Sequence, residues 1–427
     1  MKTFQFQNRS TFRRLTWLLA FLGGAGMMDL TRAQQGAPEE PDAVVVTSNN
    51  GVLSRGNQIH QTNPGPWGDL DFFYTYLEAP DSLIDLLPVP SQQTVWRFPG
   101  IYLELVRGAF EEMGLSAELR KELEEHSIWH ISDEGIRVHP SPKFVDSLPM
   151  QNRIALYRVL RRFSENPYHR NPIIIESGNV AEWFEGVGLS EHAVTAIEHL
   201  AYPLGNSLAF SDLPYLLSLM QSETEERAML KAMTRTRTLI LRLRIGENAN
   251  FEALQDYWTA GFKYKDVLPI MESIQRVEGV ERIDIAHLVP PLPRKLLYTF
   301  PSLSQGLTGR YPDSFWTALN FFEFWPKDEF LEKSAVEREL RDHFEPIQPP
   351  FRYGDLLLLV EEQSRRAMHA SVFIADDIVY TKNGSDLLRP WILMRLPDLM
   401  TRMATDERPM IEGWRRKPEA NPTPTGP

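Results

Sequence analysis

Hydrophobic and polar residues follow two different periods along the chain, and these predict a mixture of helices and strands. Residues 101–114, IYLELVRGAFEEMG, carry apolar residues at helical spacing and end in a glycine, after which Ser116 is placed to cap the next helix. Residues 70–77, LDFFYTYL, are aromatic-rich and predict a strand, as does TLILRLRI at 238–245. Because helical and strand patterns are interleaved, this part of the chain is predicted to be a mixed α+β region.

Turn and cap signals add to this picture. The residues Asp133-Glu134-Gly135 separate SIWHIS from IRVHP, which predicts a β-hairpin. Three further short helices are expected in VAEWFEGVG, SEHAVTAIEHLAY and SDLPYLLSLMQ, with Ser190 and Ser211 as the caps of the last two.

The C-terminal part has a different order of elements. A helix is predicted over 315–324, followed by strands over 354–360, 370–375 and 378–382, and then by the apolar run WILMRLPDLM. One helix followed by several strands in succession predicts a helix that packs on an antiparallel sheet.

Composition and charge narrow the possible partners and chemistry. The 427 residues are 42% hydrophobic and 24% charged, which is ordinary for a globular protein, and the net charge is -12. The negative charge argues against nucleic acid and against an anionic membrane surface as partners. The chain has no cysteine, so disulfides, zinc–thiolate sites, iron–sulfur clusters and a thiol nucleophile are excluded.

The N-terminal residues predict export. The first 14 residues carry four basic residues and no acidic one, and an apolar stretch of 14 residues follows before Ala33. This pattern indicates a signal peptide over 1–33, with an uncleaved anchor as the alternative, and hence a location in the periplasm or outside the cell. Residues 34–66 predict a linker, and 406–427 predict a polar tail. No later run is long enough to span a membrane.

Two clusters suggest ligand sites and also have plainer explanations. His126, His130 and His139 include the spacing of a metal site, but SIWHIS alternates as a strand would, and surface histidines are the competing explanation. Arg242 and Arg244 share one face of a predicted strand, where they are suited to a phosphate or carboxylate. The alternative is a solvated face balanced by the acidic residues at 223, 225 and 226. The reading implies no metal and no cofactor.

The strongest candidate for a catalytic site is formed by motifs in the segments 308–324, 351–362 and 368–384. A helix begins after Pro-Asp-Ser, a strand begins after Gly-Asp, and a second strand opens with histidine. This order resembles the NlpC/P60 family of papain-like bacterial cell-wall peptidases over residues 308–400. The resemblance places Asp313 and Ser314 at the family's Asp-Cys pair, Gly354 and Asp355 at its Gly-Asp pair, and His369 at its histidine.

The same resemblance places the third polar residue of the family's site near Thr381, with Asn383 as a neighbouring candidate. It implies a papain-like domain over 301–405, after the mixed region of unknown function over 67–300. In such a site a helix N-terminus and an imidazolium stabilise a thiolate. Serine has too high a pKa for this, so Ser314 would need His369 as a general base and a working oxyanion hole.

Several functions are compatible with these residues. The first is a pseudoenzyme of the cell envelope that binds a peptide or a cell-wall fragment in the former catalytic cleft. The second is a hydrolase or acyltransferase that uses Ser314 and His369. The third is a purely structural envelope protein, in which Ser314 is a helix cap and His369 a hydrogen-bonded packing residue. Loss of peptidase activity is the expected outcome.

Overall fold

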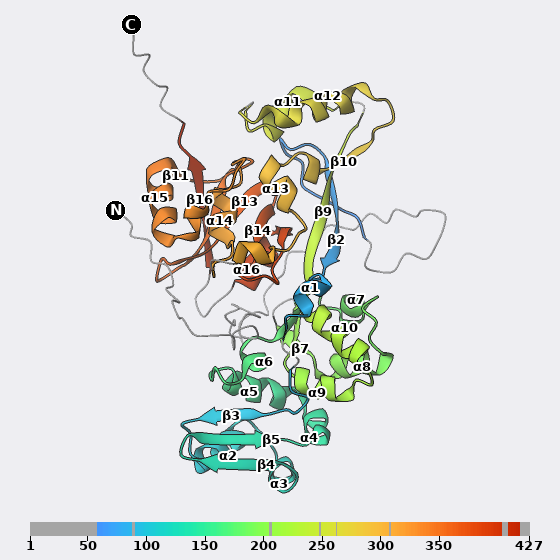
Figure 1. Cartoon of the computed structure of the whole chain (residues 1–427), viewed down its shortest axis with the longest axis vertical. Coiled ribbons are helices and arrows are strands. Elements are labelled where there is room, and N and C mark those ends of the chain that lie inside the picture. The colour runs from blue at the N-terminus through green and yellow to red at the C-terminus, as the bar shows by residue number, and fades with distance from the viewer. Residues whose placement is uncertain are drawn as a thin grey trace. The chain divides into compact units, whose positions relative to one another are not determined.

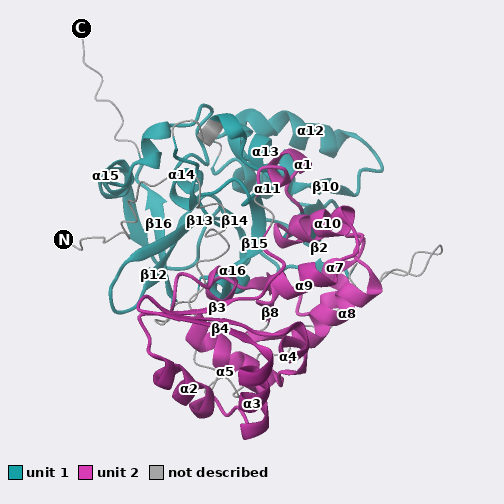
Figure 2. Ribbon diagram, turned by 60° about the horizontal axis from the view of Figure 1, so that its bottom comes forward, with its two compact units in different colours: residues 1–10, 26–77, 236–427 teal, residues 11–25, 78–235 magenta. Residues whose placement is uncertain are grey.

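The structure of the protein is a computed structural model. It describes residues 58–87, 90–204, 207–246, 249–261, 263–306, 309–403 and 409–418. The predicted signal peptide lies outside the described residues, as does most of the predicted linker. The described chain forms two compact units: Glu78–Arg235 is unit 2, and the residues up to Leu77 together with those from Thr236 onward are unit 1 (Figure 2). The expected boundary between 300 and 301 falls within unit 1.

Both units mix helices with antiparallel sheets, as the α+β prediction requires (Figure 1). Every pairing between named strands is antiparallel. Among the residues described, no helix combines the length and the apolar character needed to cross a membrane.

Unit 2 contains two three-stranded sheets. One has the order β3 (Trp96–Pro99), β5 (Gly135–His139), β4 (Ile128–Ser132), and the other has the order β6 (Ile173–Ile175), β8 (Ser207–Phe210), β7 (Tyr202–Leu204). Its helices are α1 (Asp81–Ile84), α2 (Leu103–Glu112), α3 (Ala117–His126), α4 (Pro142–Ser147), α5 (Met150–Leu160), α6 (Pro167–Arg170), α7 (Val180–Phe184), α8 (Glu191–Leu200), α9 (Leu213–Leu219) and α10 (Glu223–Met233).

The predicted caps in unit 2 have different outcomes. Ser116 accepts a hydrogen bond from the Leu119 N–H at the start of α3, and Ser190 caps α8, so both predictions are confirmed. The cap predicted at Ser211 is wrong, because Asp212 occupies the N-cap of α9. The Asp212 carboxylate does not cap the helix, since it accepts a hydrogen bond from the Tyr157 hydroxyl at 2.5 Å instead. The hairpin predicted around Asp133-Glu134-Gly135 is formed by β4 and β5.

The first sheet of unit 1 has the order β1 (His60–Gln61), β2 (Leu70–Leu77), β9 (Thr236–Arg244), β10 (Arg282–Asp284). The strand predicted over 70–77 is confirmed at both ends. Arg242 on β9 donates from Nε to the Asp71 carboxylate at 2.8 Å, and Arg282 also pairs with Asp71. Of the two arginines that the prediction named, Arg242 is therefore balanced by a buried acid on the neighbouring strand.

The helices of unit 1 lie mainly in its C-terminal half. They are α11 (Phe251–Trp258), η1 (Lys265–Val267), α12 (Leu268–Arg276), η2 (Ile285–His287), α13 (Pro291–Leu296), η3 (Leu303–Gly306), α14 (Ser314–Leu319), η4 (Asp328–Leu331), α15 (Lys333–His343) and α16 (Leu396–Arg402). The helix predicted over 315–324 ends early, at Leu319. The Asn320 side chain ends it by donating to the Trp316 carbonyl at 3.0 Å and accepting from the Lys327 N–H at 2.7 Å.

The second sheet of unit 1 has six strands. Their order is β11 (Phe344–Ile347), β16 (Pro409–Arg416), β12 (Leu356–Glu361), β13 (Ala367–Ala375), β14 (Ile378–Lys382), β15 (Trp391–Arg395). The polar tail predicted over 406–427 is wrong for Pro409–Arg416, because β16 pairs with β11 on one side and with β12 on the other. The charges of this strand are tolerated because each has a partner: Glu412 pairs with Arg365, Arg415 with Asp355 and Arg416 with Glu339.

The two faces of the six-stranded sheet bury different side chains. Leu356 and Leu358 of β12 belong to a large core that also contains the apolar residues of α14. Leu357 and Leu359 point the other way, into a smaller core with Phe373. This alternation is the period of two expected for a strand that is covered on both faces.

Candidate functional site

The candidate site begins at the N-terminus of α14. Asp313 is the N-cap, and its Oδ1 accepts a hydrogen bond from the Trp316 N–H at 2.8 Å. Ser314 is therefore the first residue of the helix and not its cap, which corrects the alternative that made Ser314 the capping residue. Burial raises the pKa of the Asp313 carboxyl, and the backbone N–H groups at the helix start and Lys382 act in the opposite direction.

The Ser314 hydroxyl has a partner on the sheet. Its Oγ accepts a hydrogen bond from the Ala370 N–H on β13 at 3.3 Å. The pairing of β13 with β14 stops at Val372 and Tyr380, just before this position. The hydroxyl therefore accepts a hydrogen bond from a strand N–H group at the point where the pairing of β13 with β14 ends. Such a group is costly to leave unpaired in the interior.

Thr381 forms a hydrogen bond with the carbonyl of Ala370. Its hydroxyl donates to the Ala370 oxygen at 3.2 Å, and the Thr381 oxygen lies 2.6 Å from Nε2 of His369. The donor in the contact between Thr381 and His369 depends on the tautomer of the imidazole, and in either tautomer this contact orients the ring. Thr381, and not Asn383, is the polar residue that orients His369.

Ser314 and His369 are linked through Ala370 and Thr381, but no hydrogen bond joins them directly in this stretch of described chain. His369 lies opposite Leu359 in the ladder between β12 and β13. Directly opposed residues of an antiparallel pair point to the same face, and Leu359 belongs to the smaller core. The imidazole thus lies on the face of the sheet that α14 does not cover.

The protonation of the histidine follows from its burial. Only 3% of His369 is exposed. This burial lowers its pKa to about 3, so the ring is neutral at physiological pH. A base of such low pKa, without a hydrogen bond to the serine hydroxyl, is poorly suited to remove its proton.

The Gly-Asp pair has a structural explanation. Gly354 has φ +86°, and a Cβ at this position would lie 2.4 Å from the Phe322 ring, so both the backbone angle and the packing require glycine. Asp355 accepts two hydrogen bonds from Arg415, at 2.8 and 2.7 Å, and a third from the Arg352 N–H at 2.6 Å. The pair therefore fixes the start of β12 and joins it to β16.

Asn383 does not belong to the hydrogen-bonded group. Its Nδ2 lies 3.3 Å from the Met394 sulfur, and its buried Oδ1 has no hydrogen-bond partner. Asn383 therefore lies among the residues of the smaller core and makes no contact with His369 that supports a catalytic role.

Lys382 is a buried residue that the sequence analysis missed. Its ammonium group donates to the carbonyls of Gly384 at 2.6 Å and Asp386 at 3.0 Å, and it lies 5.7 Å from the centre of the Trp391 ring. Burial lowers its pKa to about 8, against the opposing effect of nearby carboxylates. The alternation of IVYTK contained the signal, because it places Lys382 on the same inward face as Tyr380.

The histidine cluster does not form a metal site. The rings of His130 and His139 meet edge to face at 5.1 Å, and no group of three potential ligands occurs in the described parts of the chain.

Comparisons of the sequence with protein-family models and with curated proteins, and of the fold with solved structures, find no match.

Proposed function

We propose that the protein is an exported, non-enzymatic protein of the cell envelope with a degenerate NlpC/P60-like domain in its C-terminal part. In this proposal Ser314, Thr381 and His369 hold the sheet and the helix together and perform no catalysis. The observation that carries it is that the Ser314 and Thr381 hydroxyls bond to the backbone N–H and carbonyl of Ala370, while the imidazole lies on the face of the sheet away from α14.

The arrangement of elements supports the papain-like assignment. Ser314 begins a helix whose apolar residues share one core with β12, β13 and β14, and the elements follow the order expected for the family. Gly354 and Asp355 precede β12, and His369 lies near the start of β13, which agrees with the order of the motifs. The His369 ring departs from the family's pattern, because it lies on the face of the sheet away from α14 and does not face Ser314.

The proposal places no ligand in the former cleft. The exposed fraction is 6% for Ser314, 3% for His369 and 0% for Thr381. A peptide or a cell-wall fragment could reach these groups only if β14 separated from β13 and α14, which would break the hydrogen bonds to Ala370. The burial therefore favours a structural role over ligand binding at this position.

A Ser–His hydrolase is the second candidate, favoured by one observation. Ser314 lies at a helix N-terminus and is connected to a histidine through only two residues. Catalysis would require the His369 ring to move to the other face of the sheet and to regain a pKa near neutrality.

The variant Ser314→Cys distinguishes the two candidates. The chain has no other cysteine, so iodoacetamide reports on this thiol alone. We expect slow labelling of the folded protein, with an apparent pKa not below the roughly 8.5 of a free thiol, and the same value after His369→Ala. Labelling in urea is the control for reagent access. An apparent pKa below 8.5 that rises when His369 is removed would refute the structural role and support the hydrolase.

A further inference from the structure

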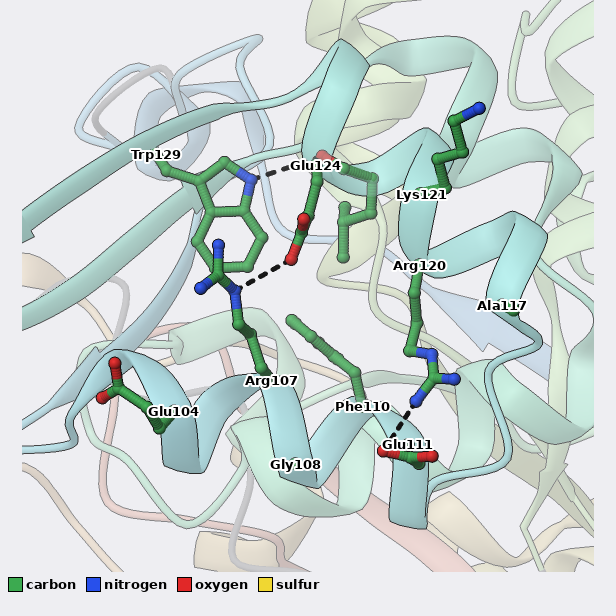
Figure 3. Close-up of a pocket in the computed structure, with 11 residues that line it drawn as sticks. Glu104, Arg107, Gly108, Phe110, Glu111, Ala117, Arg120, Lys121, Glu124 and Trp129 are labelled. Carbon is green, nitrogen blue, oxygen red and sulfur yellow. Dashed lines mark hydrogen bonds and ion pairs between the residues drawn. The ribbon is translucent and has the colours of Figure 1, made fainter.

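Unit 2 contains a pocket that is separate from the Ser314 group. It lies between α2 and α3 and is closed on one side by β4, with a volume of about 590 Å³ (Figure 3). This volume is within the range that holds small organic ligands and short peptides. The lining residues are Glu104, Arg107, Gly108, Phe110, Glu111, Ala117, Arg120, Lys121, Leu123, Glu124 and Trp129.

The apolar part of the pocket is held in place. Phe110 and Leu123 are buried in unit 2, and the half-buried Trp129 ring meets Phe110 edge to face at 6.1 Å. The Trp129 indole N–H donates to the Leu123 carbonyl at 3.3 Å, which fixes the orientation of the ring. The pocket therefore presents the half-buried Trp129 ring, which the buried Phe110 and Leu123 hold in place, and ordering this ring adds little to the cost of binding.

Gly108 keeps one wall of the pocket open. It lies in the interior of α2, where glycine is among the least favourable residues for helix stability. A Cβ at this position would meet no atom within 4 Å, and the backbone has no positive φ here. Neither packing nor backbone geometry requires glycine, so a side chain here would only fill the space beside the pocket.

The rim of the pocket carries both charges. Arg107 donates to Glu124 at 2.8 Å, and Arg120 pairs with Glu111 at 2.9 Å (Figure 3). Ion pairs as exposed as these contribute little to stability, so a ligand can replace either partner at small cost. With Glu104 and Lys121 the lining residues comprise three carboxylates and three cations.

We propose that this pocket binds a short peptide that carries one basic and one acidic side chain on either side of apolar residues. The apolar residues would lie on the half-buried Trp129 ring. The carboxylate of the peptide would replace a glutamate on Arg107 or Arg120, and its cation would bind the glutamate that is released. A purely anionic ligand, such as a phosphate, would meet three carboxylates, and a purely cationic ligand would meet three cations.

The inference does not rest on the proposed function of unit 1. Its test uses the full-length protein and three capped tetrapeptides, measured by isothermal titration calorimetry. They are acetyl-Lys-Phe-Leu-Glu-amide, acetyl-Lys-Phe-Leu-Lys-amide and acetyl-Glu-Phe-Leu-Glu-amide. We expect the first to bind at least about tenfold more tightly than either of the others, because only it matches both signs on the rim.

The variant Gly108→Leu tests the location. It fills the pocket from a helix position where a side chain has room, so we expect at least about a tenfold loss of affinity with no decrease in the unfolding temperature. The variant Glu112→Leu, which adds the same side chain on α2 outside the pocket lining, should keep the affinity. Absence of binding by the mixed-charge peptide, equal binding of all three peptides, or unchanged affinity in Gly108→Leu would each overturn the proposal.

Discussion

The neutral state of His369 predicts that acid weakens unit 1 through one residue. Burial holds the pKa of this imidazole at about 3 in the folded protein, against an ordinary value of 6.5. Below pH 6.5 the unfolded chain binds a proton that the folded chain does not, so stability is lost as the pH falls from 6.5 toward 3. Between pH 8 and pH 5 this lowers the free energy of unfolding by about 2 kcal/mol, because pH 5 lies about 1.5 units below the pKa of the unfolded histidine and each unit corresponds to about 1.4 kcal/mol.

The measurement compares the wild type with His369→Gln, in which an amide that can donate to or accept from Thr381 replaces the imidazole and cannot titrate. Hydrogen exchange followed by mass spectrometry, corrected for the intrinsic effect of pH on exchange, gives the free energy of opening in peptides from β13 and β14. We expect the loss between pH 8 and pH 5 to be about 2 kcal/mol smaller in the variant than in the wild type.

His169 provides a matched control in the other unit. It is also buried, and its pKa is also lowered to about 3. The variant His169→Gln should change the pH dependence of α5 and α6 and leave that of β13 and β14 unaltered. If His369→Gln and the wild type lose the same stability in β13 and β14, the imidazole is not buried in its neutral form, and the reasoning is wrong.

Two substitutions test the structural explanation of the Gly-Asp pair. Gly354→Ala should destabilise the protein by about 2–4 kcal/mol in urea unfolding, because it combines a left-handed backbone angle with a contact to Phe322. The control Gly279→Ala, with φ +85° and no atom within 4 Å, should cost only about 1–2 kcal/mol. Equal losses in the two variants would show that the Phe322 ring simply moves aside. Asp355→Asn should lower the free energy of unfolding by about 1–3 kcal/mol, because it weakens the bidentate ion pair with Arg415. The control Asp342→Asn, at an exposed ion pair, should lower it by less than about 0.5 kcal/mol. A small effect of Asp355→Asn would contradict its role in joining β12 to β16.

Strands with strong alternation or high apolar content could be predicted from the sequence. The residues 70–77 and 378–382 form strands with the predicted bounds. The strand β16 could not be found in this way, because PMIEGWRR has no alternation of apolar and polar residues and is followed by a proline-rich polar sequence. Its place in the sheet depends on ion pairs with residues distant in the chain, and a local pattern does not contain these.

The candidate site shows the same limit. The sequence order was sufficient to place Ser314 in the first turn of a helix and His369 near the start of a strand that this helix contacts. It did not show that the strand pairing turns the imidazole to the opposite face, because that direction depends on the register with β12 and on a bulge between the two strands. It also missed Arg415 as the partner of Asp355, because the residue was assigned to the polar tail.

The position of β16 has a consequence for the order in which the protein folds. The described part of unit 2 is one continuous segment, Glu78–Arg235, and can become compact as soon as Arg235 has been synthesised. In the six-stranded sheet of unit 1, β16 separates β11 from β12, although these two strands lie close in the sequence. Until residues 409–416 arrive, β12 has an unpaired edge rich in leucine, and such an edge promotes aggregation. During synthesis the chain must therefore be kept from association until almost the whole sequence has been made. Premature termination before residue 409 would leave a species with exposed leucine-rich strands and not a shorter folded protein.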